Sequence, residues 1–258
     1  MNSANKYLYF ASDFHLGAPN AEKSLVRERA LINWLEQIED SAHSIFLLGD
    51  IFDFWFEYKT VVPKGYIRLL GKLATLSDKG IQIHLFKGNH DMWMFDYFEK
   101  ELGVKIHSHE LTFDFAGKQF YLHHGDGLGP GDYKYKFLKL FFRSQVCQWL
   151  FARLHPNFGI GLASFLSRRS RAKGGKKDLV YNGPEQEWLF QYVKEKQAIQ
   201  HRDYYIFGHR HLPLNLEVGS AKYINTGDWL QHNTFAVFDL QELHLMKWKN
   251  GQMLPYES

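Results

Sequence analysis

Short clusters of potential metal ligands recur five times along this 258-residue chain, each at the end of an apolar run. They supply carboxylate, amide and imidazole groups and no thiolate, which suits two hard or borderline divalent ions. Two such ions about 3.5–4 Å apart are a common device for in-line attack at phosphorus. Any fold of this chain must therefore bring these clusters together. They are Asp13-Phe14-His15, Gly49-Asp50-Ile51-Phe52-Asp53, Gly88-Asn89-His90-Asp91, His123-His124-Gly125-Asp126 and Gly208-His209-Arg210-His211.

The first half of the chain alternates strand and helix patterns. Apolar runs at Tyr7–Ala11, Ser44–Leu48 and Ile81–Phe86 predict buried strands. Helical spacing of apolar residues between them, at 31–38 and 66–73, predicts intervening helices. This rhythm indicates a parallel sheet with helices outside, whose ligands lie beyond the carboxyl ends of the strands. Later strands are predicted at Leu111–Phe115, Gln119–His123, Tyr204–Phe207, Lys222–Asn225, Phe235–Leu240 and Leu243–Trp248.

A basic and apolar insertion separates these two halves. We expect one domain, 1–258, with a helical insertion at about 131–182 that contains helices over Tyr133–His155 and Phe158–Arg169. A cationic loop, Arg168–Lys177, follows, and Pro184 should open one more helix. Between Gly131 and Lys177 there are eleven basic residues and one acidic residue, so this segment has a net charge of +10. The whole chain has a net charge of +3, and the remainder therefore carries −7.

The insertion admits two interpretations. Its apolar residues cover well over half of the helix circumference beside a basic stripe, which is typical of an interfacial helix or a lid over an amphiphilic substrate. A helix packed into a cap, with its basic residues solvated, fits equally well. The cationic loop has no interleaved aromatic residue, so we expect no nucleic-acid partner.

The compartment is expected to be the cytosol. Cys147 is the single cysteine, and residues 1–10 lack a signal-peptide pattern. The chain also has no run of about 18 apolar residues that could span a membrane.

The five motifs, in this order, resemble those of the calcineurin-like metallophosphoesterase superfamily. The resemblance implies an α/β fold, a four-layer α-β-β-α sandwich, and an activated water as nucleophile. It also implies two ligand sets that share a bridging carboxylate. Asp13, His15, Asp50 and His211 would hold one ion, and Asp50, Asn89, His124 and His209 the other.

Two residues beside the ligands are candidates for catalysis. His90 stands next to Asn89, where its imidazole could reach a phosphate oxygen or a leaving group, and Asp91 would orient it and favour its protonated form. Asp53 is interpreted as an orienting residue. His123 is left out because strand alternation points it away from His124.

One branch of the superfamily is more similar: the UDP-2,3-diacylglucosamine hydrolases of lipid A synthesis. The likeness lies in Leu48–Trp55, in His124–Leu128, and in a helical insertion before a basic loop. It implies hydrolysis of a UDP-linked diacylglucosamine to UMP and an acylated sugar 1-phosphate at the cytoplasmic membrane face, with manganese as the expected metal. Substrate contacts would be Asp132, Tyr135, Arg168, Arg171 and Lys177.

The chain departs from this branch at one position. Many members carry Arg where this chain has His90, and His is the general superfamily residue. Two alternatives therefore stay open: a phosphoesterase acting on another lipid-linked or nucleotide phosphoester, and a non-catalytic membrane-binding scaffold. The intact ligand positions speak against the scaffold.

Overall fold

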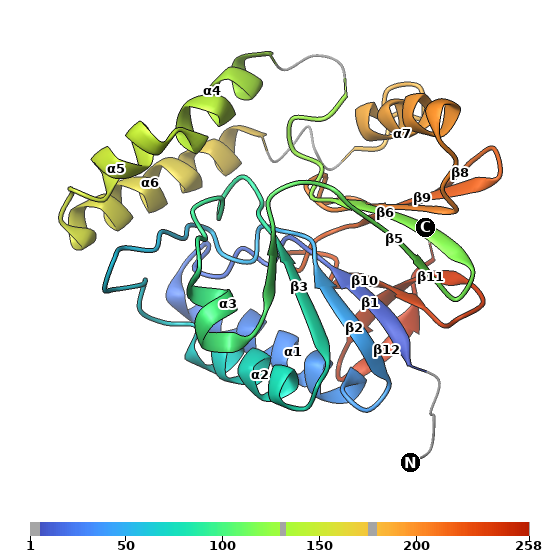
Figure 1. Cartoon of the computed structure of the whole chain (residues 1–258), viewed down its shortest axis with the longest axis horizontal. Coiled ribbons are helices and arrows are strands. Elements are labelled where there is room, and N and C mark those ends of the chain that lie inside the picture. The colour runs from blue at the N-terminus through green and yellow to red at the C-terminus, as the bar shows by residue number, and fades with distance from the viewer. Residues whose placement is uncertain (1–5, 130–132, 175–179, 258) are drawn as a thin grey trace.

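Two β-sheets face each other, with helices on both outer sides (Figure 1). This computed structural model describes residues 6–129, 133–174 and 180–257, apart from the side chains of residues 134 and 170–174. The four layers are those expected from the resemblance. Strands far apart in the sequence meet within each sheet, so both the N-terminal and the C-terminal halves build the core.

The first sheet has seven strands and a parallel centre. Strands β1, β2 and β3 run parallel, as the alternating pattern predicted. Strand β4 adds to them in parallel, and β10, β11 and β12 extend the sheet in antiparallel fashion beyond β1. In spatial order they are β12 (Gln252–Pro255), β11 (Leu243–Lys249), β10 (Thr234–Phe238), β1 (Tyr7–Ala11), β2 (Ala42–Leu47), β3 (Gln82–Phe86) and β4 (Lys105–His107).

The second sheet has five strands. The predicted strands β5 and β6 pair as an antiparallel hairpin at one edge, and β6, β7 and β9 run parallel. The sequence did not predict β8, nor the short edge strands β4 and β12 of the first sheet. In spatial order the strands are β5 (Leu111–Phe115), β6 (Lys118–His123), β7 (Tyr204–Phe207), β9 (Ala221–Thr226) and β8 (Pro213–Val218).

Strand alternation builds two cores at once. In β1, Tyr9 and Ala11 face helices α1 (Ala21–Ile38), α2 (Ile67–Asp78) and α3 (Tyr97–Leu102), which cover the outer side of the first sheet. Leu8 and Phe10 face the opposite way and pack between the sheets. Helix α7 (Trp188–Ile199) covers the second sheet. Because every central strand is buried on both faces, only its carboxyl end remains open for polar side chains.

Helix α7 begins later than predicted. Pro184 lies in a turn, and the helix starts at Trp188, after Glu187 in an extended conformation. The buried Glu187 carboxylate pairs with Arg210, with 3.0 Å between Oε2 and Nε. This long-range ion pair fixes the segment before α7, which local sequence signals could not reveal.

The insertion forms three helices that project from the sandwich: α4 (Tyr133–Arg143), α5 (Gln145–Phe151) and α6 (Pro156–Gly174). The first predicted helix is interrupted because Ser144 is extended and its hydroxyl accepts the N–H of Cys147, which caps α5. Residues 170–174, expected in a loop, continue α6. No helix among the described residues combines the length and apolar character needed to cross a bilayer.

One aromatic side chain anchors the insertion to the sandwich. The Phe151 ring packs among four aromatic rings, with ring centroids 4.7 Å from those of Phe56 and Trp93 and farther from those of Phe54 and Tyr58. The Trp93 indole N–H also donates to the Phe142 carbonyl at 2.8 Å. The loop after β2 therefore serves both as a metal-ligand loop and as the seat of the insertion.

Candidate metal centre

All five sequence clusters meet at one edge of the two facing sheets. Asp13 follows β1, Asp50 follows β2, and Asn89 follows β3, while His124 and His209 follow β6 and β7 of the second sheet. Parallel strands carry their carboxyl ends to the same edge, so residues more than a hundred positions apart become neighbours.

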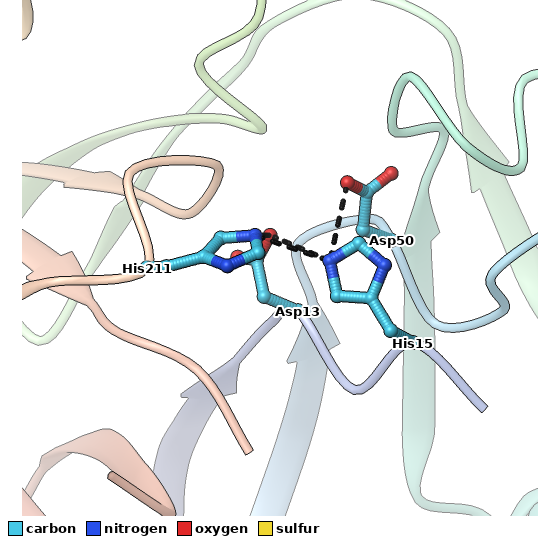
Figure 2. A group of neighbouring side chains, drawn as sticks. All are labelled: Asp13, His15, Asp50 and His211. Atoms are coloured by element: carbon cyan, nitrogen blue, oxygen red, sulfur yellow. Dashed lines mark hydrogen bonds and ion pairs between the residues drawn. The ribbon is translucent and has the colours of Figure 1, made fainter. Parts of the chain in front are cut away.

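A first group joins four of the predicted ligands (Figure 2). The Nε2 atoms of His15 and His211 face each other at 3.1 Å. Asp13 Oδ1 lies 3.2 Å from His211 Nε2 and 3.8 Å from His15 Nε2. Asp50 Oδ2 completes the group, 3.7 Å from His15 Nε2.

A second group shares Asp50. His124 Nε2 lies 3.5 Å from Asp50 Oδ2 and 3.2 Å from Asn89 Oδ1. His209 belongs to the same group, and its backbone N–H donates to Asp13 Oδ2 at 2.8 Å. The structure thus brings together all seven residues of the two predicted ligand sets, with Asp50 between them.

The backbone at these positions is strained. Five of the seven residues occupy the left-handed region although none is glycine: Asp13, His15, Asp50, His209 and His211, with φ between 42° and 66°. Each such residue costs on the order of 1 kcal/mol, and such strain concentrates at functional sites. Gly49 is required here, since a Cβ on it would lie 2.6 Å from His124 Nδ1.

The electrostatics of the buried cluster favour a cation. Burial lowers the pKa of His124, but Asp50 outweighs burial and raises it to about 10. Burial likewise lowers the pKa of His211, while Asp13 raises it to about 9. Burial raises the pKa of Asp50, yet His124 and His90 hold that pKa well below its usual range. Protons are drawn into the cluster by its carboxylates, and a divalent cation can take their place.

The donor set itself fits divalent metal. Two imidazole nitrogens face each other in the first group, and the buried Asp13 Oδ1 has no well-aligned hydrogen bond among the described residues. The Nδ1–H of His124 donates to the Leu48 carbonyl oxygen at 2.7 Å, which directs Nε2 toward Asp50. Oxygen and nitrogen donors around a common centre are the environment of Mn, Fe, Zn, Co or Mg.

The predicted partner of His90 is wrong. Asp91 is fully buried and accepts the backbone N–H groups of Gly88 and Ile51, at 2.8 and 2.7 Å, and more weakly those of Asp50 and Phe52. Burial and the neighbouring Asp50 raise the pKa of Asp91 to about 7. Its carboxylate is thus used to hold two metal-ligand loops together, and it does not orient the imidazole.

Asp53, and not Asp91, contacts the His90 imidazole. His90 Nδ1 lies 3.2 Å from the Asp53 carbonyl, 3.9 Å from Asp53 Oδ1 and 2.8 Å from Ser167 Oγ. Asp53 Oδ1 also lies 3.7 Å from His15 Nδ1, which agrees with its interpretation as an orienting residue. His123 accepts the Gly125 N–H and lies in neither ligand group.

The predicted substrate contacts differ in their surroundings. The Tyr135 hydroxyl donates to Asp126 Oδ2 at 2.7 Å, which ties the first turn of α4 to the metal loop after β6. Arg168 is exposed, and its Nε donates to the Ser164 carbonyl one turn back along α6. Asp132, Lys177 and the Arg171 side chain lie outside the described residues.

Sequence reasoning missed Asp228. This fully buried residue has Oδ2 3.7 Å from His211 Nδ1, while Oδ1 accepts the backbone N–H of His232 and lies 3.1 Å from His232 Nδ1. It thus contacts the predicted ligand His211 at Nδ1, the ring nitrogen opposite the Nε2 that belongs to the first group. The signal was present, because Asp228 follows β9 in a polar strand-end segment like those of the five clusters.

Two facing sheets that gather carboxylates and imidazoles at their strand ends describe a metal-dependent phosphoesterase. The chain belongs to the calcineurin-like phosphoesterase family, whose model matches residues 7–213. It is 41% identical over 249 residues to UDP-2,3-diacylglucosamine hydrolase of Porphyromonas gingivalis, covering 90% of this chain and 94% of the relative. It is 29% identical to the Pseudomonas fluorescens protein of the same name, covering 84% and 85%. Among solved structures, the phosphoesterase YfcE of E. coli aligns with a TM-score of 0.47 at 15% identity, over 96% of each chain.

Proposed function

We propose that this protein hydrolyses the pyrophosphate of UDP-2,3-diacylglucosamine, releasing UMP and 2,3-diacylglucosamine 1-phosphate. The observation that carries the proposal is the position of helix α6, whose Ser167 lies 2.8 Å from His90. The candidate phosphate-cleaving centre therefore lies next to the apolar and basic surface of the insertion. A substrate with a pyrophosphate and two acyl chains needs both. The relatives' shared name supports the same substrate.

The metal centre would hold two divalent ions, with manganese as the proposed native metal. Asp13, His15, Asp50 and His211 would ligate one ion, and Asp50, Asn89, His124 and His209 the other. When bound, the ions supply charge neutralisation at the phosphate and lower the pKa of a water. The chain itself contributes a rigid, pre-strained cradle, because three loops are locked by Asp91 and by the His124–Leu48 contact.

His90 would serve as the acid-base group for this cleavage. Its Nδ1 edge is occupied by Asp53 and Ser167, which leaves Nε2 for a phosphate oxygen or for the leaving group. Basic residues near the site would hold the remaining phosphate charge, with Arg168, Arg171 and Lys177 as the proposed contacts and Asp132 and Tyr135 on the sugar side. Lys139, which pairs with Asp126 at 2.6 Å, would hold the insertion next to the metal-ligand loop after β6.

The insertion would accommodate the acyl chains and border the membrane. Its large apolar side chains are open to solvent: Phe137 is 74% exposed, Leu140 71% and Trp149 55%. A soluble protein rarely exposes such a contiguous set without a partner, and the surrounding basic residues suit anionic lipid. We place the protein at the cytoplasmic face of the membrane, as one domain, 1–258, with this insertion at about 131–182.

A second candidate is a phosphoesterase for another lipid-linked or nucleotide phosphoester. The observation that favours it is His90, where the resembling branch commonly carries Arg. It would use the same metal centre and differ only in the substrate held by the insertion.

A substrate panel separates these candidates. Purified protein with Mn²⁺ is incubated with UDP-2,3-diacylglucosamine, UDP-N-acetylglucosamine, a phospholipid, a cyclic nucleotide and an aryl phosphodiester, and products are quantified. We expect UMP from the diacylated substrate at the highest kcat/KM, and none from Asp50→Asn. Asp114→Asn, at an exposed position of β5, is the matched control and should retain full activity. Absence of UMP across several divalent metals would contradict the proposal.

A further inference from the structure

Helix α6 touches the metal-centre loops through the Ser167 hydroxyl. Ser167 Oγ lies 2.8 Å from His90 Nδ1, and it is 3.0 Å from both the Asp53 carbonyl oxygen and Asp53 Oδ1. Ser167 is separated from His90 by 77 positions and from Asp53 by 114. Three elements that share no local sequence relation thus meet at this side chain, which is half-buried.

The contacts define how the His90 ring is held. A serine hydroxyl has one proton to donate and lone pairs to accept. When it donates to Asp53, its oxygen accepts the Nδ1–H of His90, and that arrangement directs the opposite nitrogen, Nε2, away from Asp53. The His90 ring also packs edge-on against His15, with centroids 4.8 Å apart. Ser167 and His15 therefore fix the ring from two sides.

The same helix presents apolar side chains to solvent. Phe158, Leu162, Phe165 and Leu166 of α6 are between 41% and 61% exposed, and the last two directly precede Ser167. An occupant that covers these side chains bears on the turn that carries the hydroxyl. Contacts at a distance from the reacting bond raise kcat only when they improve alignment in the transition state.

We infer that Ser167 is a positioning residue: it couples occupation of helix α6 by the acyl chains to alignment of His90 at the scissile pyrophosphate. This inference rests on the proposed function. It explains how the insertion contributes to turnover as well as to binding. It also means that the insertion supplies a partner for His90. His90 is the position at which this chain differs from many members of the branch that it resembles.

A double-mutant cycle tests the coupling. Ser167→Ala, His90→Ala and the double variant are compared on the diacylated substrate and on UDP-N-acetylglucosamine. We expect Ser167→Ala to lower kcat for the diacylated substrate about 10- to 100-fold, short of the full contribution of an acid-base group, with KM changed less than about twofold. In the His90→Ala background Ser167→Ala should have no further effect, because residues that act as a unit are not additive.

Two control variants isolate the hydroxyl. Ser167→Thr keeps the oxygen and should restore most of kcat, whereas Ser164→Ala, on the same helix but without a side-chain hydrogen bond among the described residues, should be neutral. The advantage in kcat of the diacylated over the non-acylated substrate should shrink toward one in Ser167→Ala. Additive losses, a loss in KM alone, or an unchanged advantage would overturn the inference.

A spectroscopic readout separates this inference from the proposed function. Nitrogen-15 spectra of the imidazoles in protein loaded with diamagnetic Zn²⁺ report the His90 Nδ1 hydrogen bond without turnover. Ser167→Ala should shift that resonance, while Ser164→Ala should leave it in place. An unchanged resonance refutes the Ser167–His90 contact even if UMP is released. A shifted resonance with no UMP release by the wild type keeps the contact, but overturns the acyl coupling together with the proposed function.

Discussion

The metal-bearing strand ends and the helical insertion are built on opposite principles. At the strand ends, ligand side chains such as Asp13, His15 and Asp50 are almost fully buried, and their loops are locked by long-range hydrogen bonds. In the insertion, large apolar side chains such as Phe137 and Leu140 lie open to solvent. Phe151, Ser167 and Tyr135 are among the residues that attach it to the sandwich.

This contrast separates two tasks. A reaction at phosphorus needs donors held to within a fraction of an ångström, which buried and strained loops provide. Recognition of flexible acyl chains needs apolar area that can adapt, which an exposed helical insertion provides. If the separation is correct, changes at the strand ends should affect every substrate, whereas changes in the insertion should affect only the amphiphilic ones.

The largest effect is expected at the residue shared by both ligand groups. Asp50→Asn removes one anionic charge between His15 and His124, so kcat should fall by more than about 100-fold. Loss of a residue that only supports a metal ligand typically costs at most about 100-fold. The loss should be the same for the diacylated substrate and for an aryl phosphodiester, measured by UMP and by nitrophenolate release. Retained activity on the aryl substrate would show that the two regions do not divide the tasks in this way.

Asp228→Asn should weaken metal binding. Its carboxylate lies 3.7 Å from His211 Nδ1, and loss of such an outer partner typically costs about 10- to 100-fold in metal affinity. Titration calorimetry of metal-free protein with Mn²⁺ measures this directly. Asp239→Asn, which removes a similar histidine contact at the surface, to His244 at 3.0 Å, is the matched control and should bind Mn²⁺ normally. Equal affinities for all three proteins would leave Asp228 without a role at the metal.

Phe151→Ala should loosen the insertion while the metal centre stays intact. Each aromatic contact contributes about 0.5–1.5 kcal/mol, so losing four should raise KM for the diacylated substrate at least about tenfold. Aryl phosphodiester turnover and Mn²⁺ affinity should stay within twofold of wild type. A parallel loss on both substrates would mean that the insertion also shapes the metal loops.

The smallest effect is expected on the open face of the insertion. Leu140→Glu should weaken binding to vesicles of anionic lipid about fivefold, since half-burial of a leucine contributes on the order of 1 kcal/mol. Stability should change by less than about 0.5 kcal/mol. Val26→Glu changes a side chain of similar exposure on α1, 67% against 71%, and should leave vesicle binding unchanged. Equal losses in co-sedimentation for both variants would indicate a charge effect unrelated to the insertion.

Much of the sandwich could be predicted from the sequence. Strands β1, β2, β3, β6 and β7 coincide with apolar runs within a residue or two, because strands buried on both faces leave an uninterrupted apolar signal. Edge strands β4, β8 and β12 were missed, since half-exposed strands mix polar and apolar residues. The position of the insertion was predicted, but its internal structure was not: Ser144 divides its first predicted helix, and residues 170–174 of the expected cationic loop continue α6.

The sequence alone determined which chemistry this chain offers and where it sits along the strands, because ligand types and strand ends are local properties. Only the tertiary structure decided which groups act on one another. Asp91 binds backbone amides, Asp53 and Ser167 hold His90, and Asp228 stands behind His211. The physical reason is that side-chain direction in these loops depends on left-handed backbone angles and on contacts across 17 to 114 positions, neither of which residue spacing encodes.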